Sequence, residues 1–187
     1  MVEIATLKTE RVILRQWQSE DYKPCAAINA DPVVMKYFPS CLSAVESDAF
    51  ADKIVSLIAK RGWGLWAVEL VDTKQFIGFV GLHQPEAKLP FTPCVEIGWR
   101  LAKAYWGVGY ATEAAQSVLQ FAFNQLNLSE VVSFTSVTNK QSKAVMQRLG
   151  MVNTRQNFEH PSVSTESPLR EHVLYKITKQ QWYAFHE

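Results

Sequence analysis

The chain has 187 residues, of which 19 are lysine or arginine and 18 are aspartate or glutamate, giving a formal net charge of +1. This length suits one domain with a sizeable core, and the balanced charge argues against a broad nucleic-acid-binding surface. No basic segment followed by an apolar run opens the sequence, and no stretch approaches about 18 apolar residues. We therefore expect neither a secretion signal nor a membrane span, and a cytoplasmic location.

The three cysteines, Cys25, Cys41 and Cys94, are widely spaced and have no histidine pair close to them in the sequence. This spacing matches neither a disulfide framework nor a metal-binding motif. We expect reduced, buried thiols and no metal.

The first half of the chain predicts strands and amphipathic helices in alternation. Ser19, followed by two acidic residues, is a candidate N-cap for a helix that Asp31-Pro32 ends. The predicted elements are a strand or strand pair at Thr6–Trp17, a helix from Ser19, an aromatic-rich piece at Val33–Pro39, a helix at Ser43–Lys60, a hairpin of Trp63–Leu70 and Phe76–His83, and a loop at Pro85–Pro93.

The second half predicts a strand, a glycine-bearing turn and a helix, and then further strands around one more helix. These elements are a strand at Val95–Ala102, a turn at Trp106–Ala111, a helix from Ala111 to Leu126, a strand at Val131–Val137, a helix at Asn139–Leu149, a strand pair of Val152–Phe158 and Glu171–Ile177 around a polar, mobile loop at His160–Leu169, and a helical turn at Thr178–Phe185.

This order of elements predicts a mixed sheet covered by helices. The strands before Trp106 and after Asn127 are joined by a helix, so we expect parallel neighbours connected by a right-handed crossover. A ligand would bind where the carboxyl ends of these two strands separate.

The turn Trp106–Ala111 leads directly into a helix, whose first N–H groups have no acceptor within the helix. Gly107 and Gly109 allow backbone conformations that other residues avoid, and small Ala111 follows. Together with the helix dipole, these features indicate an anion site that suits a pyrophosphate. Two glycines spaced in this way also occur in ordinary turns.

Five motifs in order give the chain a resemblance to the GNAT superfamily of acyl-CoA-dependent N-acyltransferases, and most closely to its RimJ/RimL-type branch of ribosomal-protein N-terminal acetyltransferases. The motifs are T-E-R-V-I-L-R, F-I-G-F-V-G-L, V-E-I-G-W-R-L, Y-W-G-V-G-Y-A-T-E-A and N-K-Q-S-K-A-V-M-Q-R-L-G-M. The resemblance covers nearly all of residues 1–187 and implies a single acetyltransferase domain. It also implies an α/β (α+β mixed) GNAT fold, with a mostly antiparallel sheet of six or seven strands, a parallel pair splayed around the acyl-CoA site, and about four helices.

The resemblance implies that acetyl-CoA is the donor and that the glycine turn binds its pyrophosphate through backbone amides. The residues this assigns are Trp106, Gly107, Val108, Gly109, Tyr110, Ala111 and Thr112, where Trp106 replaces the glutamine or arginine usual in the superfamily. Asn139 and Ser142 match residues that contact the pantetheine arm, although Asn139 would equally cap a helix.

Glu96 is the candidate general base, because it resembles an acidic residue that many GNAT enzymes place on this strand. A structural alternative pairs it with Arg100 or Lys103. Backbone amides around Trp99, Arg100 and Leu101 would pair with the pantetheine and supply the oxyanion donors.

The tyrosine that many GNAT enzymes use to protonate the leaving thiolate is replaced here by Met146. Ser142 could donate instead, or the thiolate could leave without an acid. Tyr105 and Tyr110 are further candidate donors, although tyrosines beside a glycine turn usually pack.

The candidate acceptor-binding residues are Tyr37, Phe38, Trp63 and His83. Trp66 is equally expected in the core, and His160, His172 and His186 are weaker candidates for a role in catalysis. The choice of acceptor would depend on the three loops whose structure the sequence predicts least clearly. These loops are Val33–Ser43, Pro85–Pro93 and Phe158–Leu169.

The leading hypothesis is therefore acetyl transfer from acetyl-CoA to a primary amine by direct attack in a ternary complex. The acceptor would be a protein or peptide N-terminus, with a ribosomal protein as one option. Two alternatives stay open: a small amine acceptor, such as a polyamine, an amino acid or an aminoglycoside, and a non-catalytic acyl-CoA-binding module. A monomer or a homodimer fits the sequence, with no direct partner among nucleic acids or membranes.

Overall fold

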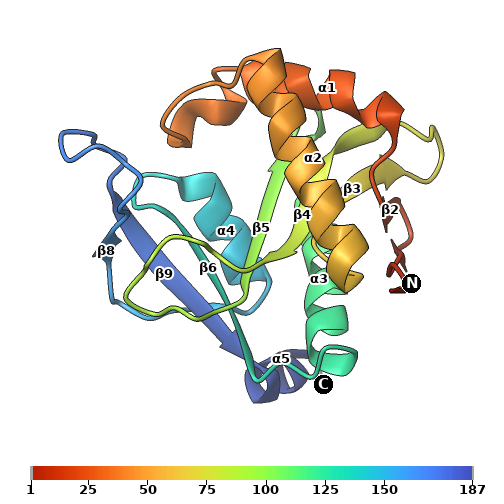
Figure 1. Cartoon of the computed structure of the whole chain (residues 1–187). Helices are drawn as coiled ribbons and strands as arrows, with labels where there is room; N and C mark the ends of the chain where they lie inside the picture. The colour runs from red at the N-terminus through yellow and green to blue at the C-terminus, as the bar shows by residue number, and fades with distance from the viewer. Residues whose placement is uncertain (1, 187) are drawn as a thin grey trace. The chain divides into compact units, whose positions relative to one another are not determined.

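The computed structural model describes residues 2–186 (Figure 1), which group into two compact units. The first unit contains the described residues up to Leu82 together with Gly98–Val118, and the second contains His83–Ile97 and the residues from Leu119 onward. The strand β5 and the helix α3 each contribute residues to both units.

The strands of the first unit follow one another in the sheet in chain order. β4 is buried from Phe76 to Leu82, as expected for a strand covered on both faces. A Cβ at Gly81 would lie 1.9 Å from the carbonyl oxygen of Gly64, so only glycine allows β3 and β4 to approach this closely. The strands are β1 (Leu7–Lys8), β2 (Val12–Arg15), β3 (Leu65–Leu70), β4 (Phe76–His83) and β5 (Glu96–Leu101).

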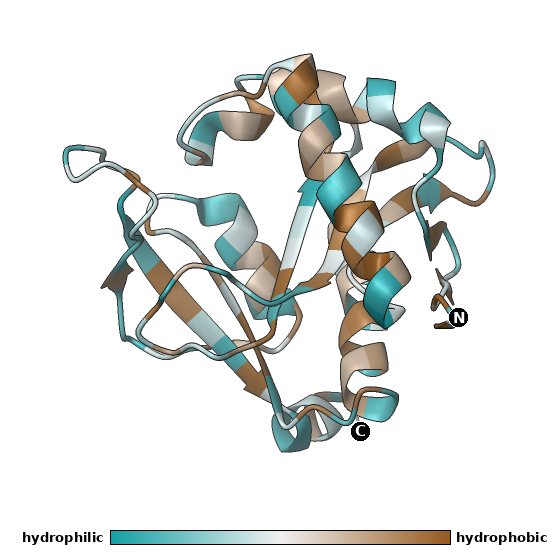
Figure 2. Ribbon diagram, in the orientation of Figure 1, coloured by the Kyte–Doolittle hydropathy of each residue, from teal (hydrophilic) through white to brown (hydrophobic). Residues whose placement is uncertain are grey.

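Two helices of the first unit, α1 (Ser19–Ala30) and α2 (Ala44–Arg61), pack against each other, and Figure 1 shows α2 crossing the strands β3 and β4. Ser43 and Glu46 form a reciprocal capping box at the start of α2. Brown and teal residues alternate along α2 in Figure 2, as its amphipathic pattern predicts. The 3₁₀ helix η1 (Val34–Tyr37) lies between α1 and α2 in the chain.

The segment after β5 builds the glycine turn. A short 3₁₀ helix, η2 (Lys103–Tyr105), follows the strand, and α3 (Tyr110–Asn124) begins directly after Gly109. The predicted order of strand, turn and helix is therefore confirmed.

The strands of the second unit are organised around β9 (Glu171–Thr178), which pairs along its whole length with β6 (Glu130–Ser136) in antiparallel register. β6 pairs in parallel with β5 at Glu96 and Val132, which confirms the predicted parallel pair. The other edge of β9 binds two short strands, β7 (Val152–Asn153) and β8 (Phe158–Glu159).

The helices of the second unit that follow α3 are α4 (Lys140–Arg148) and α5 (Lys179–His186). Trp182 of α5 packs against Phe123, with ring centroids 6.0 Å apart. A separate cluster of buried residues joins the loop before β5 to the sheet; its members are Leu89, Val132, Phe158 and Leu174.

The predicted fold class is confirmed: a mixed α/β sheet, mostly antiparallel, with one parallel pair. The numbers of elements differ from the predicted six or seven strands and about four helices, because residues 2–186 form nine strands and five α-helices. The predicted strand Val152–Phe158 is wrong as one continuous element. Arg155 has a φ of 59°, and its N–H donates to Asn153 Oδ1 over 2.8 Å, so a side-chain turn interrupts the strand.

Two local predictions are also corrected. The N-cap of α1 is Gln18, not Ser19, and the carboxylate of Asp21 accepts from the backbone N–H of Gln18 over 2.8 Å. Of the three cysteines, Cys25 is buried, but Cys41 is exposed because it lies in the turn between η1 and α2. Within the described residues, none of the helices is long and apolar enough to cross a membrane.

Candidate active site

The glycine turn of the first unit has the geometry of an anion-binding loop. Gly107 and Gly109 have φ angles of 78° and 93°, in the left-handed region that favours glycine. The N–H of Glu113 donates to Gly109 O over 3.0 Å, so the amides of Tyr110, Ala111 and Thr112 precede the first hydrogen bond of the helix. No described atom lies within 4 Å of the position that a Cβ of Gly107 would take. A phosphate therefore has both donors and room at this turn.

Arg11, in the turn between β1 and β2, binds the glycine loop and the start of α3 through its side chain. Its Nε donates to Glu113 Oε2 over 2.6 Å and its Nη1 to Val108 O over 3.0 Å. The guanidinium also lies 4.7 Å from the centroid of the Tyr110 ring. Its side chain remains 43% exposed, so the positive charge is accessible beside the loop.

Glu113, in the first turn of α3, accepts hydrogen bonds from two residues of the N-terminal strands. Thr9 Oγ1 donates over 2.6 Å and the backbone N–H of Arg11 over 2.9 Å. Burial acts to raise the pKa of Glu113, but the hydrogen bonds from Thr9 and Arg11 lower it below its ordinary value overall. The carboxylate is therefore ionised at neutral pH and binds the loop to the first strands.

The residue before the glycines, Trp106, has a structural contact of its own. Its indole Nε1 donates to the carbonyl oxygen of Leu101 over 2.8 Å, which anchors the loop to the end of β5. The rings of Tyr105 and Tyr110 lie 6.3 Å apart and pack at the same turn. Trp99, also on β5, is partly buried.

In the second unit, Glu96 at the start of β5 lies beside His83 at the end of β4. Its Oε2 is 3.2 Å from His83 Nε2, and the Glu96 side chain is 14% exposed. The structural alternative predicted Arg100 or Lys103 as the partner of this carboxyl group, but the side chain in contact with it is His83. Two predicted site residues are thus brought together.

Burial raises the pKa of the Glu96 carboxyl from 4.5 to about 8. An acid with this pKa changes its protonation state close to neutral pH, which is the property that a general base requires.

Asn139 is both the cap of α4 and the partner of Ser142. Its Oδ1 accepts from the N–H of Ser142 over 3.1 Å, which confirms the helix-cap prediction. Its Nδ2 donates to Thr135 Oγ1 over 2.9 Å and to Ser142 Oγ over 3.1 Å. The Ser142 oxygen is therefore occupied as an acceptor, and its own proton has no acceptor among residues 2–186.

Met146, at the position of the expected tyrosine, is 1% exposed and belongs to the core. His160 and His172 lie with their ring centroids 5.0 Å apart, next to Phe134 and Phe158. Burial lowers the pKa of both histidines, so they pack as neutral rings at physiological pH. Among the described residues, no group of three or more histidine, cysteine or acidic side chains could hold a metal ion.

The predicted acceptor-binding residues of the first unit lie on surface segments. Phe38, after η1, is 37% exposed, and Tyr37 contacts Lys36. Trp63 is partly buried beneath the Arg61 guanidinium, 4.1 Å from its ring. Trp66 is fully buried, which confirms the core alternative.

Sequence reasoning missed Thr9, Arg11 and Glu113 as supports of the glycine loop. Arg11 and Glu113 lie inside two of the motifs quoted above, but they are 102 residues apart in the chain. A single sequence gives no signal that joins them, because only the folded sheet brings the first turn to the start of α3.

Replacing Glu96 by glutamine changes how stability depends on pH. The folded protein retains a proton on Glu96 up to about pH 8, whereas the unfolded chain releases it near 4.5. Stability from this group is therefore complete below 4.5 and declines as pH rises through 8. We expect the melting temperature of Glu96→Gln, relative to the native protein, to increase across this interval in thermal unfolding scans. Glu166→Gln, at an exposed carboxylate, is the control. A melting-temperature difference between Glu96→Gln and the native protein that is the same at every pH would contradict the burial of Glu96.

The comparisons with known proteins agree with this geometry. Residues 11–152 match the family described as Acetyltransferase (GNAT) domain. The uncharacterized N-acetyltransferase YnaD of Bacillus subtilis is 27% identical over 177 residues, covering 94% of this chain and 98% of YnaD. The FsC-acetyl coenzyme A-N(2)-transacetylase of Aspergillus fumigatus is 33% identical over 184 residues, covering 95% of this chain and 77% of that protein.

A crystal structure of a GNAT-family acetyltransferase from Bacillus anthracis has the same fold. It superposes with a TM-score of 0.77 at 24% identity, covering 94% of this chain and 99% of that one. The family match spans most of the chain and includes both the glycine turn and Glu96. The chain belongs to the GNAT family of acetyltransferases and is an acetyl-CoA-dependent N-acetyltransferase.

Proposed function

We propose that this enzyme acetylates the α-amino group of a protein or peptide N-terminus, as RimJ/RimL-type enzymes do, and that residues 1–187 act as one catalytic domain. The observation that carries the proposal is the largely buried carboxyl of Glu96, 14% exposed and 3.2 Å from His83 Nε2, whose pKa burial raises to about 8. An unperturbed α-amino group has a pKa of about 7.7–8.0, against about 10.4 for a lysine side chain. The pKa of the base therefore matches that of the acceptor amine, and proton transfer from an α-ammonium group to Glu96 is close to thermoneutral.

In this proposal the glycine turn binds the pyrophosphate of acetyl-CoA, which supplies the thioester carbonyl that the amine attacks. The amides of Gly107 to Thr112 would donate to the phosphate oxygens, and Arg11 would add a positive charge beside them. The hydrogen bond from Arg11 to Val108 O supports this role, because it holds the guanidinium against the loop. Backbone amides of Trp99 to Leu101 would pair with the pantetheine arm and stabilise the oxyanion.

Ser142 is the proposed hydrogen-bond donor to the sulfur of the leaving thiolate, and it keeps its own proton. Its Oγ accepts from Asn139 Nδ2, which directs the hydroxyl proton away from Asn139. Met146 provides no acid and is buried. A thiol with a pKa of about 8.5 needs little assistance to leave, so a weak donor is sufficient.

A small amine is the second candidate acceptor. The name of the Aspergillus fumigatus relative states transfer from acetyl coenzyme A to an N(2) position, and that relative is 33% identical to this chain. Family membership identifies the chain as an acetyltransferase, so the non-catalytic alternative is not retained.

One experiment tests the proposed function. Thermal unfolding with and without acetyl-CoA reports cofactor binding, because a ligand that binds only the folded state raises stability. Release of CoA thiol is then measured with N-terminal peptides, lysine-only peptides carrying a blocked N-terminus, and polyamines. Acetylation of free N-termini supports the proposal. Turnover confined to polyamines or to lysine side chains would overturn it.

Gly109→Val should weaken acetyl-CoA binding by about 10-fold or more, or ~1.4 kcal/mol. Gly109 has a φ of 93°, which a β-branched residue adopts only with strain, and its Cβ would lie 3.3 Å from Arg11 Nη2. Isothermal titration with acetyl-CoA measures the effect, and circular dichroism checks the fold. Native affinity in this variant would show that the turn binds no phosphate.

Arg11→Ala should also raise the dissociation constant for acetyl-CoA, by about 10-fold, with a smaller effect on kcat. The change removes a charge near the loop and the hydrogen bonds to Glu113 and Val108. Arg148→Ala, at an exposed arginine of α4, is the matched control. Equal affinities in both variants would remove Arg11 from the site.

Glu96→Gln should lower kcat by about 100-fold and remove the part of the pH dependence that Glu96 causes. In the native enzyme, kcat/KM should rise with pH and level off above about 8, because Glu96 accepts a proton only when ionised. The acceptor amine titrates in the same direction, so the profile is measured with acceptors of two different pKa values. If the native profile simply follows the acceptor and Glu96→Gln retains kcat, Glu96 is not the base.

A further inference from the structure

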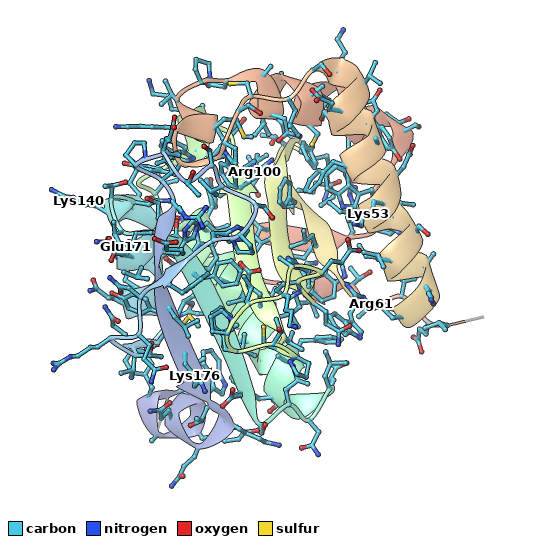
Figure 3. The ribbon with its side chains drawn as sticks, turned by 60° about the vertical axis from the view of Figure 1, so that its left-hand side comes forward. Lys53, Arg61, Arg100, Lys140, Glu171 and Lys176 are labelled. Atoms are coloured by element: carbon cyan, nitrogen blue, oxygen red, sulfur yellow. The ribbon has the colours of Figure 1, made fainter. Side chains whose placement is uncertain are left out.

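Arg100 on β5 is a cation held among aromatic rings in the first unit. Its Cζ lies 4.1 Å from the ring centroid of Phe38, 5.5 Å from that of Phe50 and 5.2 Å from that of Phe79. Its Nη1 donates to Asn29 Oδ1 over 2.7 Å. Figure 3 labels Arg100 beside β5, close to the segments that carry these residues.

Within the part of the chain that the structure describes, no carboxylate forms an ion pair with Arg100. Its buried Nε has no hydrogen-bond partner within residues 2–186. Burial lowers the pKa of Arg100 to about 10, so the side chain remains charged at neutral pH. Withdrawing a cation from water without an anionic partner is costly, and an anionic ligand at the guanidinium would offset this cost.

The strand provides space beside this cation. Gly98 and Arg100 are two residues apart in β5, so their side-chain positions face the same side of the strand. Outside Gly98 and its two chain neighbours, no described atom lies within 4 Å of the position that a Cβ of Gly98 would take. Arg100 itself is only partly buried, so an entering group can reach the guanidinium.

We propose that Arg100 binds a side-chain carboxylate of the acceptor, in the space beside Gly98, so that the enzyme prefers peptides that carry an acidic residue near the N-terminus. This inference rests on the proposed function, because it concerns the acceptor of the same acetyl transfer. A guanidinium presents a fork of N–H donors that matches a carboxylate in two hydrogen bonds. Polyamines and aminoglycosides are disfavoured, because their positive charges would meet Arg100.

A purely structural role for Arg100 makes a different prediction. Stacking on three phenylalanine rings contributes to stability whatever the acceptor is. Loss of that role would lower turnover with every acceptor alike. A carboxylate-binding role instead lowers turnover only with acceptors that carry the carboxylate.

The first measurement separates this inference from the proposed function. A peptide with an aspartate near its N-terminus and the matched peptide with asparagine there are titrated onto the enzyme loaded with CoA, which has no acetyl group to transfer. We expect the aspartate peptide to bind about 10-fold more tightly or better, as hydrogen bonds to a charged group imply. Equal binding of the pair overturns the inference even if acetyl transfer is observed. Selective binding of the aspartate peptide supports it even if no acceptor in the panel is acetylated, in which case the proposed function fails by itself.

The second measurement compares kcat/KM for matched acceptors in variants. Arg100→Gln should lower kcat/KM for peptides with an acidic side chain near the N-terminus by about 10- to 100-fold more than for the matched peptides with the neutral amide side chain. Arg100→Lys retains the charge but loses the fork of N–H donors. Its kcat/KM for the carboxylate-bearing acceptors should lie between those of the native enzyme and of Arg100→Gln. Arg148→Gln is the matched control for loss of an exposed arginine. An equal loss with both acceptors of a pair would assign Arg100 a structural role and overturn the proposal.

Gly98→Val provides a test that leaves Arg100 in place. The added side chain would fill the open space without touching described atoms at Cβ, so the fold should be retained, as circular dichroism and acetyl-CoA affinity will show. We expect the ratio of kcat/KM for the carboxylate-bearing acceptor to kcat/KM for its neutral amide counterpart to fall toward one. Full retention of that preference in a folded Gly98→Val enzyme would exclude this position for the carboxylate.

Discussion

The carboxylate of Glu113 is the fixed point of the cofactor-binding loop. It stands in the first turn of α3, where a negative charge is favoured by the helix dipole, and it accepts from Thr9 and Arg11. The same arginine engages Val108 O and stacks on Tyr110. The left-handed glycines leave this stretch of backbone free to adopt many conformations in the unfolded chain, and these contacts select one of them. The order of the loop thus depends on the first strands of the chain.

The two ionisable residues of β5 show opposite responses to burial. The neutral form of Glu96 is favoured, which places its pKa near that of an α-amino group. Arg100 remains charged at neutral pH in spite of burial, with an amide oxygen and aromatic faces as its partners. A group that releases its charge is suited to moving a proton, whereas a group that keeps its charge is suited to holding an anion. One strand thus supplies two kinds of chemistry, because burial neutralises a carboxyl group at neutral pH but not a guanidinium.

Much of the fold could be predicted from local pattern. Three features depend on residues close in sequence, so the sequence predicts them directly: the glycine turn between β5 and α3, the amphipathic α2, and the cap of α4 by Asn139. The break at Arg155 and the cap at Gln18 depend on single hydrogen bonds that propensity does not encode. Arg11 with Glu113, Glu96 with His83 and Arg100 with Asn29 are formed by the tertiary fold. The candidate residues were therefore predictable where a motif carries them, and their partners were not.

The cap at Asn139 illustrates how one residue joins a structural role to a chemical one. An amide side chain offers two donors and one oxygen acceptor, and here the oxygen caps α4 while the donors reach Thr135 and Ser142. Because Ser142 Oγ accepts from Asn139, its proton must be directed elsewhere. An alanine at 139 would lose the cap and would also release the Ser142 hydroxyl to rotate. The choice between helix cap and cofactor-site residue is therefore not exclusive, since the cap itself sets the direction in which Ser142 can donate.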